Sequence, residues 1–474
     1  MVFSSLTFVV FFLPLTILLH FICKNPIWRN GVLLLFSLIF YAWGEPVWIF
    51  AMLTTVTINY VSARCMEHAK NIGIKRLWMI LGVALSLGFL FYFKYCGFVL
   101  NNVSSLFNIS IDFKAPVMPI GISFYTFQVI TYTVDVYRGK VEVQRNYGHL
   151  LLYVSFFPQL IAGPIVNYSD IKEQLEKRNI SLNDFYEGFM RFFIGFGKKI
   201  LIANTCGIIT EKIDAVAQMS LSGAWVLAIA YALQIYFDFS GYSDMAIGIG
   251  RMFGFKFLEN FNYPYISKSI TEFWRRWHIS LGAFFREYVY IPLGGNRVGK
   301  IKLLRNIMIV WMLTGIWHGA SWNFIIWGLY YGVLLVLEKF VLLRIKEKLP
   351  NFVNVFITLL LVLIGWVFFY YIDLGAGIEH LGIMFGIISR PLTDAVTIYY
   401  FKYYLMFIIA GALASVPWKS FVKKLMGEKK VESMKEGIDN SAIILKPLFA
   451  TLVFLASLAV LIGQSYNPFL YFRF

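Results

Sequence analysis

The chain has 474 residues, of which 59% are hydrophobic and 14% are charged, and its mean hydropathy is +0.68. A soluble domain is typically about 45–50% apolar and about 25% charged, so this composition excludes a soluble globular enzyme and a disordered chain. The formal charge is +16, but the basic residues cluster in short loops between apolar runs. That pattern sets orientation in a membrane and does not indicate nucleic-acid binding. We therefore expect an all-α polytopic protein that forms one integral-membrane domain over residues 1–474.

Apolar runs long enough to cross a bilayer, which takes about 20 residues, recur along the chain. They are continuous and lack the alternation of outer-membrane strands, which excludes a β-barrel. They predict about 11–13 passes, some of them re-entrant or interfacial. The stronger candidates are Ser5–Ile22, Val47–Val61, Leu77–Tyr95, Val117–Val136, Leu150–Val166, Trp225–Phe239, Leu303–Trp317, Trp322–Leu343, Phe352–Tyr371, Tyr404–Val416 and Leu448–Gly463; the weaker ones are Gly31–Trp43, Phe189–Ala203 and Met245–Phe255.

The basic loops predict the orientation of these passes, because cytoplasmic loops carry an excess of Lys and Arg. Counting outward from them places both termini outside the cytoplasm, together with the loop Asn101–Ala115. The first apolar run has no basic leader and no small-residue cleavage site, so it is interpreted as a membrane helix and not a signal peptide. The loops that should face the cytoplasm contain Lys24 and Arg29, Arg64 to Arg76, Arg138 to Arg145, Arg344 to Lys348, and Lys419 to Lys430.

The segment Lys256–Arg305 is long, basic and aromatic, with nine Lys or Arg and three Glu. Within it, Trp274, Trp277 and Leu281 have the spacing of one helical face, and Arg275 and Arg276 lie off that face. This pattern predicts one amphipathic helix that lies in the cytoplasmic interface. A basic juxtamembrane loop that holds lipid headgroups is the alternative.

Two histidines stand out, because an ionisable residue within an apolar span is costly and is a functional hypothesis by default. His318 ends an apolar run, and Gly315 and Gly319 beside it leave room for another group to approach. His278 lies forty residues earlier, in the basic aromatic segment, and a neutral imidazole can take a proton from a hydroxyl. Two such residues can converge on one site. The alternatives are a hydrogen-bonded packing role for His318 and an interfacial anchor for His278.

Other polar features point less clearly to chemistry. Asp238 and Asp244 enclose a Ser, Gly and Tyr sequence, which is interpreted as a satisfied polar bend and not as a metal site. The four cysteines are isolated, so neither a disulfide framework nor a zinc site is predicted. Pro158 and Pro164 break one apolar run and indicate a re-entrant or kinked segment, a device that transporters also use.

Five motifs, in order along about the first 340 residues, resemble the membrane-bound O-acyltransferase family. The similar branch comprises bacterial alginate and peptidoglycan O-acetyltransferase membrane subunits, and the D-alanyl transfer protein of teichoic acid modification is a relative. The motifs are Pro119–Phe127, Asp135–Gly139, Ser155–Pro164, Phe273–Leu281 with Tyr290–Gly295, and Trp317–Ala320.

The resemblance implies a ring of helices around a thinned membrane centre and an O-acyltransferase activity. It implies that His318 is the catalytic histidine and His278 the second active-site histidine. We expect His318 to act as the base and His278 to orient substrate or polarise the carbonyl. Candidates for the donor entrance and substrate channel are Trp274, Arg275, Arg276, Trp277, Trp317 and Asn323.

The resemblance also implies substrates and partners. No bound cofactor is expected, and the co-substrate is a cytoplasmic acyl thioester, either acetyl-CoA or an acyl-carrier protein. We expect a bacterial cytoplasmic membrane, an extracytoplasmic SGNH-type acetyltransferase partner, contact with membrane lipids, and no nucleic acid. Tyr471, in the aromatic tail 464–474, is a candidate acyl relay, with an aromatic interface anchor as the alternative. The predicted reaction is O-acetylation of a cell-surface polysaccharide, with D-alanyl transfer to teichoic acids as the alternative and a transporter as a third.

Overall fold

The computed structural model describes residues 1–161, 163–342, 348–418, 421–422, 435–463 and 469–470. Throughout these ranges every regular element is a helix. Nine helices in them are long and apolar enough to cross a membrane, and a shorter apolar helix covers Phe8–Ile22. The protein is therefore a multi-pass α-helical membrane protein, as predicted. The nine spans of the described ranges are fewer than the expected number, and the candidates Val117–Val136 and Leu303–Trp317 are not among them.

The helices gather into two compact units. Unit 1 comprises Met1–Phe189 and Ala246–Leu258, and unit 2 comprises Met190–Met245 and Glu259–Phe474. The single domain and the ring of helices expected from the sequence concern both units together and stay predictions.

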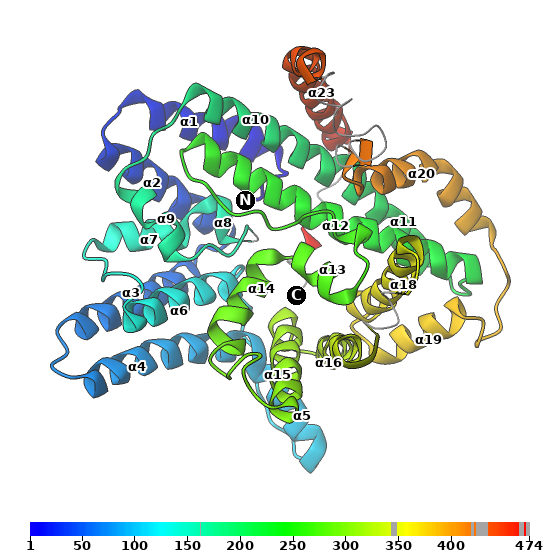
Figure 1. Ribbon diagram of the computed structural model, residues 1–474, viewed down its shortest axis with the longest axis horizontal. Helices are drawn as coiled ribbons and strands as arrows, with labels where there is room; N and C mark the ends of the chain where they lie inside the picture. Colours follow the sequence, from blue (N-terminus) through cyan, green and yellow to red (C-terminus); the bar gives the residue numbers. More distant parts are fainter. Residues whose placement is uncertain (162, 343–347, 419–420, 423–434, 464–468, 471–474) are drawn as a thin grey trace. The chain divides into compact units, whose positions relative to one another are not determined.

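Unit 1 is built around three adjacent helices, α3, α4 and α6, which lie side by side in Figure 1. A buried hydrogen-bond chain joins them: Thr133 Oγ1 donates to Asn59 Oδ1 over 2.6 Å, and Asn59 Nδ2 donates to Ser86 Oγ over 2.7 Å. Buried polar groups of this kind need partners, and here each helix supplies one. The helices of unit 1 are α1 (Leu13–Ile22), α2 (Pro26–Gly44), α3 (Ile49–Glu67), α4 (Ile72–Leu90), α5 (Cys96–Phe107), α6 (Ile122–Arg138), α7 (Tyr147–Ser155), α8 (Phe157–Leu160) and α9 (Tyr168–Glu176), with the π-helical turns Phe8–Phe12 and Phe91–Tyr95.

Two segments of unit 1 test the sequence predictions directly. The break predicted around Pro158 is confirmed, because α7 ends at Ser155 and the short α8 begins at Phe157. The expected loop Asn101–Ala115 is wrong in its first half, since the helix that starts at Ile72 continues through α5 to Phe107. Asn108 then ends it in the left-handed conformation, which asparagine adopts more readily than most residues.

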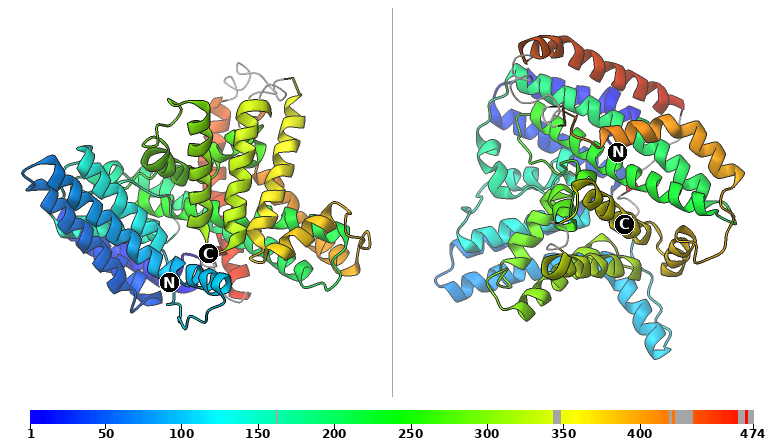
Figure 2. Two further views of the ribbon diagram at one scale, coloured as in Figure 1. Left: turned by 90° about the horizontal axis from the view of Figure 1, so that it is seen from below. Right: turned by 45° about the vertical axis from the view of Figure 1, so that its right-hand side comes forward.

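Unit 2 contains a hairpin of α15 and α16 with α18 packed against it, and Figure 2 shows the three helices running side by side. The helices of unit 2 are α11 (Asn204–Asp214), α13 (Ile270–Arg276), α14 (Ile279–Phe285), α15 (Lys300–His318), α16 (Trp322–Leu337), α18 (Asn351–Tyr370), α19 (Leu374–Met384), α20 (Ala395–Ala414) and α23 (Lys435–Gly463). Short turns complete it: the π-helical turns Lys198–Ala203, Arg286–Tyr290 and Glu338–Leu342, and the 3-10 turn Pro264–Ile266. Two further helices, α10 (Leu182–Gly197) and α12 (Leu221–Met252), begin in one unit and end in the other.

The polar bend predicted between Asp238 and Asp244 is wrong, because both residues lie inside α12, one continuous helix of 32 residues. The helix stays intact because its carboxylates are neutralised by the neighbouring segment. Asp238 pairs with Lys199 at 2.5 Å, and Asp244 pairs with Lys198 at 2.6 Å and with Arg191 at 2.8 Å. Paired charges cost far less inside a protein than isolated ones, so the polar stretch does not have to leave the helix.

Candidate active site

The segment that carries His278 differs from its predicted form. The sequence predicts one amphipathic helix through Thr271–Leu281, but the chain forms two short helices, α13 and α14, with His278 between them at φ 45° and ψ 53°. This left-handed conformation is uncommon for a residue with a side chain and is held only where the surroundings determine it. Trp274, Trp277 and Leu281 therefore do not share one helical face, and Trp277 is buried within unit 2.

Asn260 is the residue that fixes this junction. Its side-chain Oδ1 accepts hydrogen bonds from Ser280 N at 3.1 Å and Ser280 Oγ at 2.9 Å, and it contacts His278 Nδ1 at 3.3 Å. Its backbone carbonyl accepts a further hydrogen bond from Ile279 N at 3.0 Å. Burial lowers the pKa of His278 to about 3, so its imidazole is neutral at pH 7.

The start of α13 is held by a carboxylate from another part of unit 2. Glu338, which is 1% exposed and follows α16, accepts hydrogen bonds from Ile270 N at 2.7 Å and Thr271 N at 2.9 Å. The first amides of a helix have no partner within it and carry a partial positive charge, so an anion there stabilises the helix end. Glu338 thus holds the start of α13, eight residues before His278, together with the N-cap residue Ser269, whose Oγ accepts from Glu272 N at 3.0 Å.

His318 is the last residue of α15, and Gly319 to Ser321 make the tight bend that leads into α16. Its side chain is 5% exposed and lies among aromatic rings. The ring centroids of Trp317, Trp327 and Phe369 are 4.8, 4.9 and 5.0 Å from that of the imidazole. Helices α15, α16 and α18 each supply one of these rings, so the position of His318 depends on the packing of all three.

The space predicted beside His318 is filled by α16. A Cβ atom added at Gly315 would lie 2.3 Å from Phe324 O, and one added at Gly319 would lie 2.2 Å from the Phe324 ring. At Gly328 the same atom would lie 2.3 Å from Trp311 O. Another group does approach these glycines, as expected, and it belongs to α16: its backbone at Gly315 and the Phe324 ring at Gly319.

His278 and His318 both lie near the indole ring of Trp317. The Trp317 centroid lies 5.8 Å from the His278 ring and 4.8 Å from the His318 ring. Phe239 of α12 also packs edge-on against His278, at 4.7 Å between centroids. Both histidines thus lie near one side chain of unit 2, and their convergence on one site stays a prediction.

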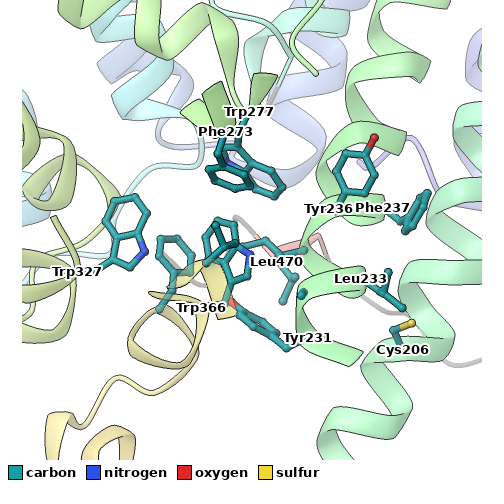
Figure 3. Close-up of a cluster of buried hydrophobic side chains, with 14 of the residues drawn as sticks. Cys206, Tyr231, Leu233, Tyr236, Phe237, Phe273, Trp277, Trp327, Trp366 and Leu470 are labelled. Carbon is teal, nitrogen blue, oxygen red and sulfur yellow. The ribbon is translucent and has the colours of Figure 1, made fainter. Parts of the chain in front are cut away.

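A cluster of large aromatic side chains, drawn in Figure 3, includes Trp327, whose ring packs against that of His318. Trp277 packs against Trp366 at 4.8 Å and against Phe273 at 5.7 Å, and the same cluster includes Trp327. Figure 3 shows Phe273 and Trp277 facing Trp366 across the cluster, with Leu470 beside them. Such packing removes water, and a low-dielectric site strengthens electrostatic interactions with a reacting group.

Most of the six side chains proposed for the donor entrance pack against other side chains or are buried. Trp274 packs against Trp311 and Tyr331, and Trp317 and Asn323 are buried. The guanidinium of Arg276 donates to Glu272 Oε1 and to Asn262 O, while Asn323 Nδ2 donates to Phe368 O at 3.2 Å. Of the six candidates, Arg275 alone has an exposed side chain.

The described part of the C-terminal tail enters the interior of unit 2. Leu470 N donates to Asp238 Oδ2 at 2.8 Å, and this carboxylate is the one that pairs with buried Lys199. Phe469 stacks on Tyr242 at 4.9 Å and lies 5.9 Å from the ring of Phe239. Tyr471 itself lies outside the described residues.

Asn260, Glu338 and Lys199 were not selected from the sequence, and Asp238 was interpreted as part of a polar bend and not as the partner of a buried lysine. The pairing of Lys199 with Asp238 could have been predicted from the sequence, since opposite charges in two neighbouring apolar runs favour a buried pair. No sequence pattern predicted the roles of Asn260 and Glu338, because these roles depend on backbone amides that the fold brings close to them.

Fold and site together define a multi-pass helical membrane protein with two buried histidines near a buried indole. The profile of MBOAT, the membrane-bound O-acyltransferase family, matches residues 143–374, which include both histidines and Asn260. The chain belongs to this family and is an O-acyltransferase.

Three relatives show how the similarity extends along the chain. A probable alginate O-acetylase AlgI of Pseudomonas putida is 39% identical over 487 aligned residues, covering 100% of both chains. The peptidoglycan O-acetyltransferase of Helicobacter pylori is 36% identical, covering 82% of this chain and 80% of its own. The teichoic acid D-alanyltransferase of Bacillus subtilis is 29% identical, covering 65% of this chain and 85% of its own.

Proposed function

We propose that this protein takes an acetyl group from a cytoplasmic thioester and passes it on for O-acetylation of a cell-surface polysaccharide. The observation that carries the proposal is the similarity along the entire chain to a protein named for alginate O-acetylation. The peptidoglycan relative supports the same acetyl chemistry, and the D-alanyl relative is less similar over a shorter part of the chain. D-alanyl transfer is therefore the second candidate.

The reaction needs a base and an environment without water. A hydroxyl oxygen bonds to the thioester carbonyl carbon while a histidine nitrogen takes the hydroxyl proton. The C–S bond then breaks, and the leaving sulfur receives that proton as a thiol. A positioned base contributes about 10²–10⁴-fold to the rate. We assign this role to His318, whose aromatic surroundings exclude competing water.

The tail supplies a candidate first acceptor. In our proposal the Tyr471 phenol forms the first acetyl ester, and a polysaccharide hydroxyl later displaces the phenol with return of the proton to its oxygen. Support comes from its described neighbours, since Leu470 is tied to Asp238 and Phe469 packs near the Phe239 ring that contacts His278.

The proposal also covers the membrane, the acyl donor and the partner protein. The protein lies in a bacterial cytoplasmic membrane with both termini outside the cytoplasm. The donor is acetyl-CoA or an acyl-carrier protein, and exposed Arg275 would meet its phosphates. An SGNH-type transferase outside the membrane would deliver the acetyl group to the polymer. We expect lipid contacts and no nucleic acid.

The test is the acetate that mild base releases from purified surface glycans of cells carrying the intact protein or His318→Ala. We expect His318→Ala to lose this acetate by at least about 10²-fold, the contribution of a positioned base. His68→Ala, which changes an exposed histidine, is the matched control and should keep it. Full acetylation with His318→Ala at equal expression would remove His318 from the mechanism, and loss of D-alanine in place of acetate would favour the second candidate.

Tyr471 is tested separately by mass spectrometry of the purified protein after incubation with a thioester. An acetyl group on a tail peptide that is missing from Tyr471→Phe supports the relay. A fully active Tyr471→Phe protein without any acetyl-tyrosine in the parent would refute it.

A further inference from the structure

The polar framework around Asn260 determines more than the position of His278. The acceptor atom of Asn260 follows from its partner, because Ser280 N is a backbone amide and can only donate. The side-chain atom that it meets must therefore be the carboxamide oxygen and not the nitrogen. Ser280 Oγ meets the same oxygen at 2.9 Å, and a hydroxyl can donate to it.

The protonation of His278 follows from this assignment. His278 Nδ1 lies 3.3 Å from the same Asn260 oxygen, which has no proton to give. The contact is a hydrogen bond only if Nδ1 carries the proton. A neutral imidazole has one N–H, so Nε2 then carries a lone pair.

We propose that Asn260 is a positioning residue that fixes the Nδ1–H tautomer of His278, so that His278 presents Nε2 as a proton acceptor. The inference rests on the proposed function and deepens it. It decides between the two roles open to His278 from the sequence. An unprotonated Nε2 can accept a hydrogen bond from the acceptor hydroxyl and so orient it, and it does not donate to the thioester carbonyl.

Two features of the junction support this role. His278 is buried, and rings of Phe239 and Trp317 face its imidazole, so the neutral form is favoured over the imidazolium. The chain directly after its left-handed backbone is held by hydrogen bonds to Asn260, from Ile279 N and Ser280 N. Strain held by a dedicated hydrogen-bond framework is typical of a functional position.

The first experiment observes the tautomer directly. The chain has six histidines, so nitrogen-15 NMR of histidine-labelled protein in nanodiscs, with His278→Gln to assign its signals, is tractable. We expect a pyrrole-type shift at Nδ1 and a pyridine-type shift at Nε2 of His278 at pH 7. A protonated Nε2 with an unprotonated Nδ1 would overturn the proposal, whether or not the protein proves to be an acetyltransferase.

The second experiment compares variants at Asn260 with the same changes at Asn262. Asn260→Ala removes the acceptor, and we expect kcat to fall by about 10²-fold, the scale of a misplaced base, with the thioester KM unchanged. Asn260→Asp keeps the acceptor and adds a negative charge, which raises the pKa of an adjacent histidine. Its activity should return at high pH, with the acid limb of the kcat profile moved upward.

Asn262 is the matched control, because its side chain is exposed and only its backbone bonds to Arg276. Asn262→Ala and Asn262→Asp should keep the parent kcat and pH profile. If Asn260→Ala keeps the parent kcat, or if Asn260→Asp and Asn262→Asp show the same pH profile, the positioning role is refuted. A parent protein without acyl transfer would instead refute the proposed function and leave the NMR result standing.

Discussion

The two histidines of the site are held in different ways. His278 sits at a left-handed junction between two short helices, where Asn260 supplies hydrogen bonds to three consecutive residues. His318 ends a long helix, and rings of three helices enclose it. A hydrogen-bond framework selects a protonation state as well as a position, whereas ring packing selects a position and a dry environment. The difference predicts that the two residues respond to different perturbations.

The largest effect outside the histidines should come from the helix crossing that positions His318. Gly328→Ala would place a methyl group 2.3 Å from Trp311 O, so α15 and α16 must separate. Overpacking of this kind costs about 1–3 kcal/mol, and the end of α15 moves with it. We expect a lower melting temperature in detergent and a large loss of acyl transfer.

The matched control for this change is Gly282→Ala in α14, where no atom lies within 4 Å of the added methyl group. It should melt at or above the parent temperature, because alanine favours a helix by about 0.5–1 kcal/mol over glycine. Equal melting temperatures and activities for the two variants would show that the close crossing does not hold His318.

A smaller effect is expected where α13 begins. Glu338→Gln keeps one acceptor for Ile270 N and Thr271 N and turns an amide group toward the other. A buried N–H left without a partner costs about 1–3 kcal/mol. The melting temperature should fall, and so should activity, because α13 leads directly to His278.

Glu379→Gln is the comparison for Glu338, since its carboxylate is half-exposed and pairs with Arg390 at 3.1 Å. Surface pairs contribute at most about 1 kcal/mol, so this variant should melt close to the parent. A melting temperature for Glu338→Gln no lower than for Glu379→Gln would contradict the capping role.

The smallest expected effect is a dependence of stability on pH. Burial lowers the pKa of His278 to about 3 and that of His380 to about 4, against about 6.5 in an unfolded chain. As pH falls below about 6.5, the unfolded chain takes up protons that the folded chain does not, so the free energy of unfolding decreases. The melting temperature should therefore be lower at about pH 5 than at about pH 7.

His380→Gln should reduce this decline, because one of the buried neutral histidines is gone. His68→Gln changes an exposed histidine and should leave the decline unchanged. Identical declines for the parent and His380→Gln would show that His380 is not buried in its neutral form.

Much of the fold follows from composition and run length. The helical class, the membrane-spanning character and the break at Pro158 were all predicted, because hydrophobic length and proline act locally. The error at α12 arose because the residues that neutralise its carboxylates are distant in the sequence. Asp238 and Asp244 were expected to break a helix, and their partners Lys199, Lys198 and Arg191 lie in a different segment.

Part of the site could also be predicted, because burial of an ionisable side chain is visible in a short stretch of sequence. His278 and His318 were selected because an imidazole in an apolar or interfacial segment needs an explanation. Gly315 and Gly319 were expected to let another group approach, but the sequence does not tell that this group belongs to α16. The roles of Asn260 and Glu338 had no local signal at all.

The sequence by itself determined that this chain is a helical membrane protein and which histidines are candidates for chemistry, since hydrophobicity and ionisation belong to single residues and short runs. Only the tertiary structure decided that both imidazoles lie near the indole of Trp317 and that Glu338 binds the first amides of the helix before His278. It also decided which nitrogen of His278 faces Asn260. Hydrogen bonds and close packing join atoms that are distant in the chain, so these features exist only once the helices have packed.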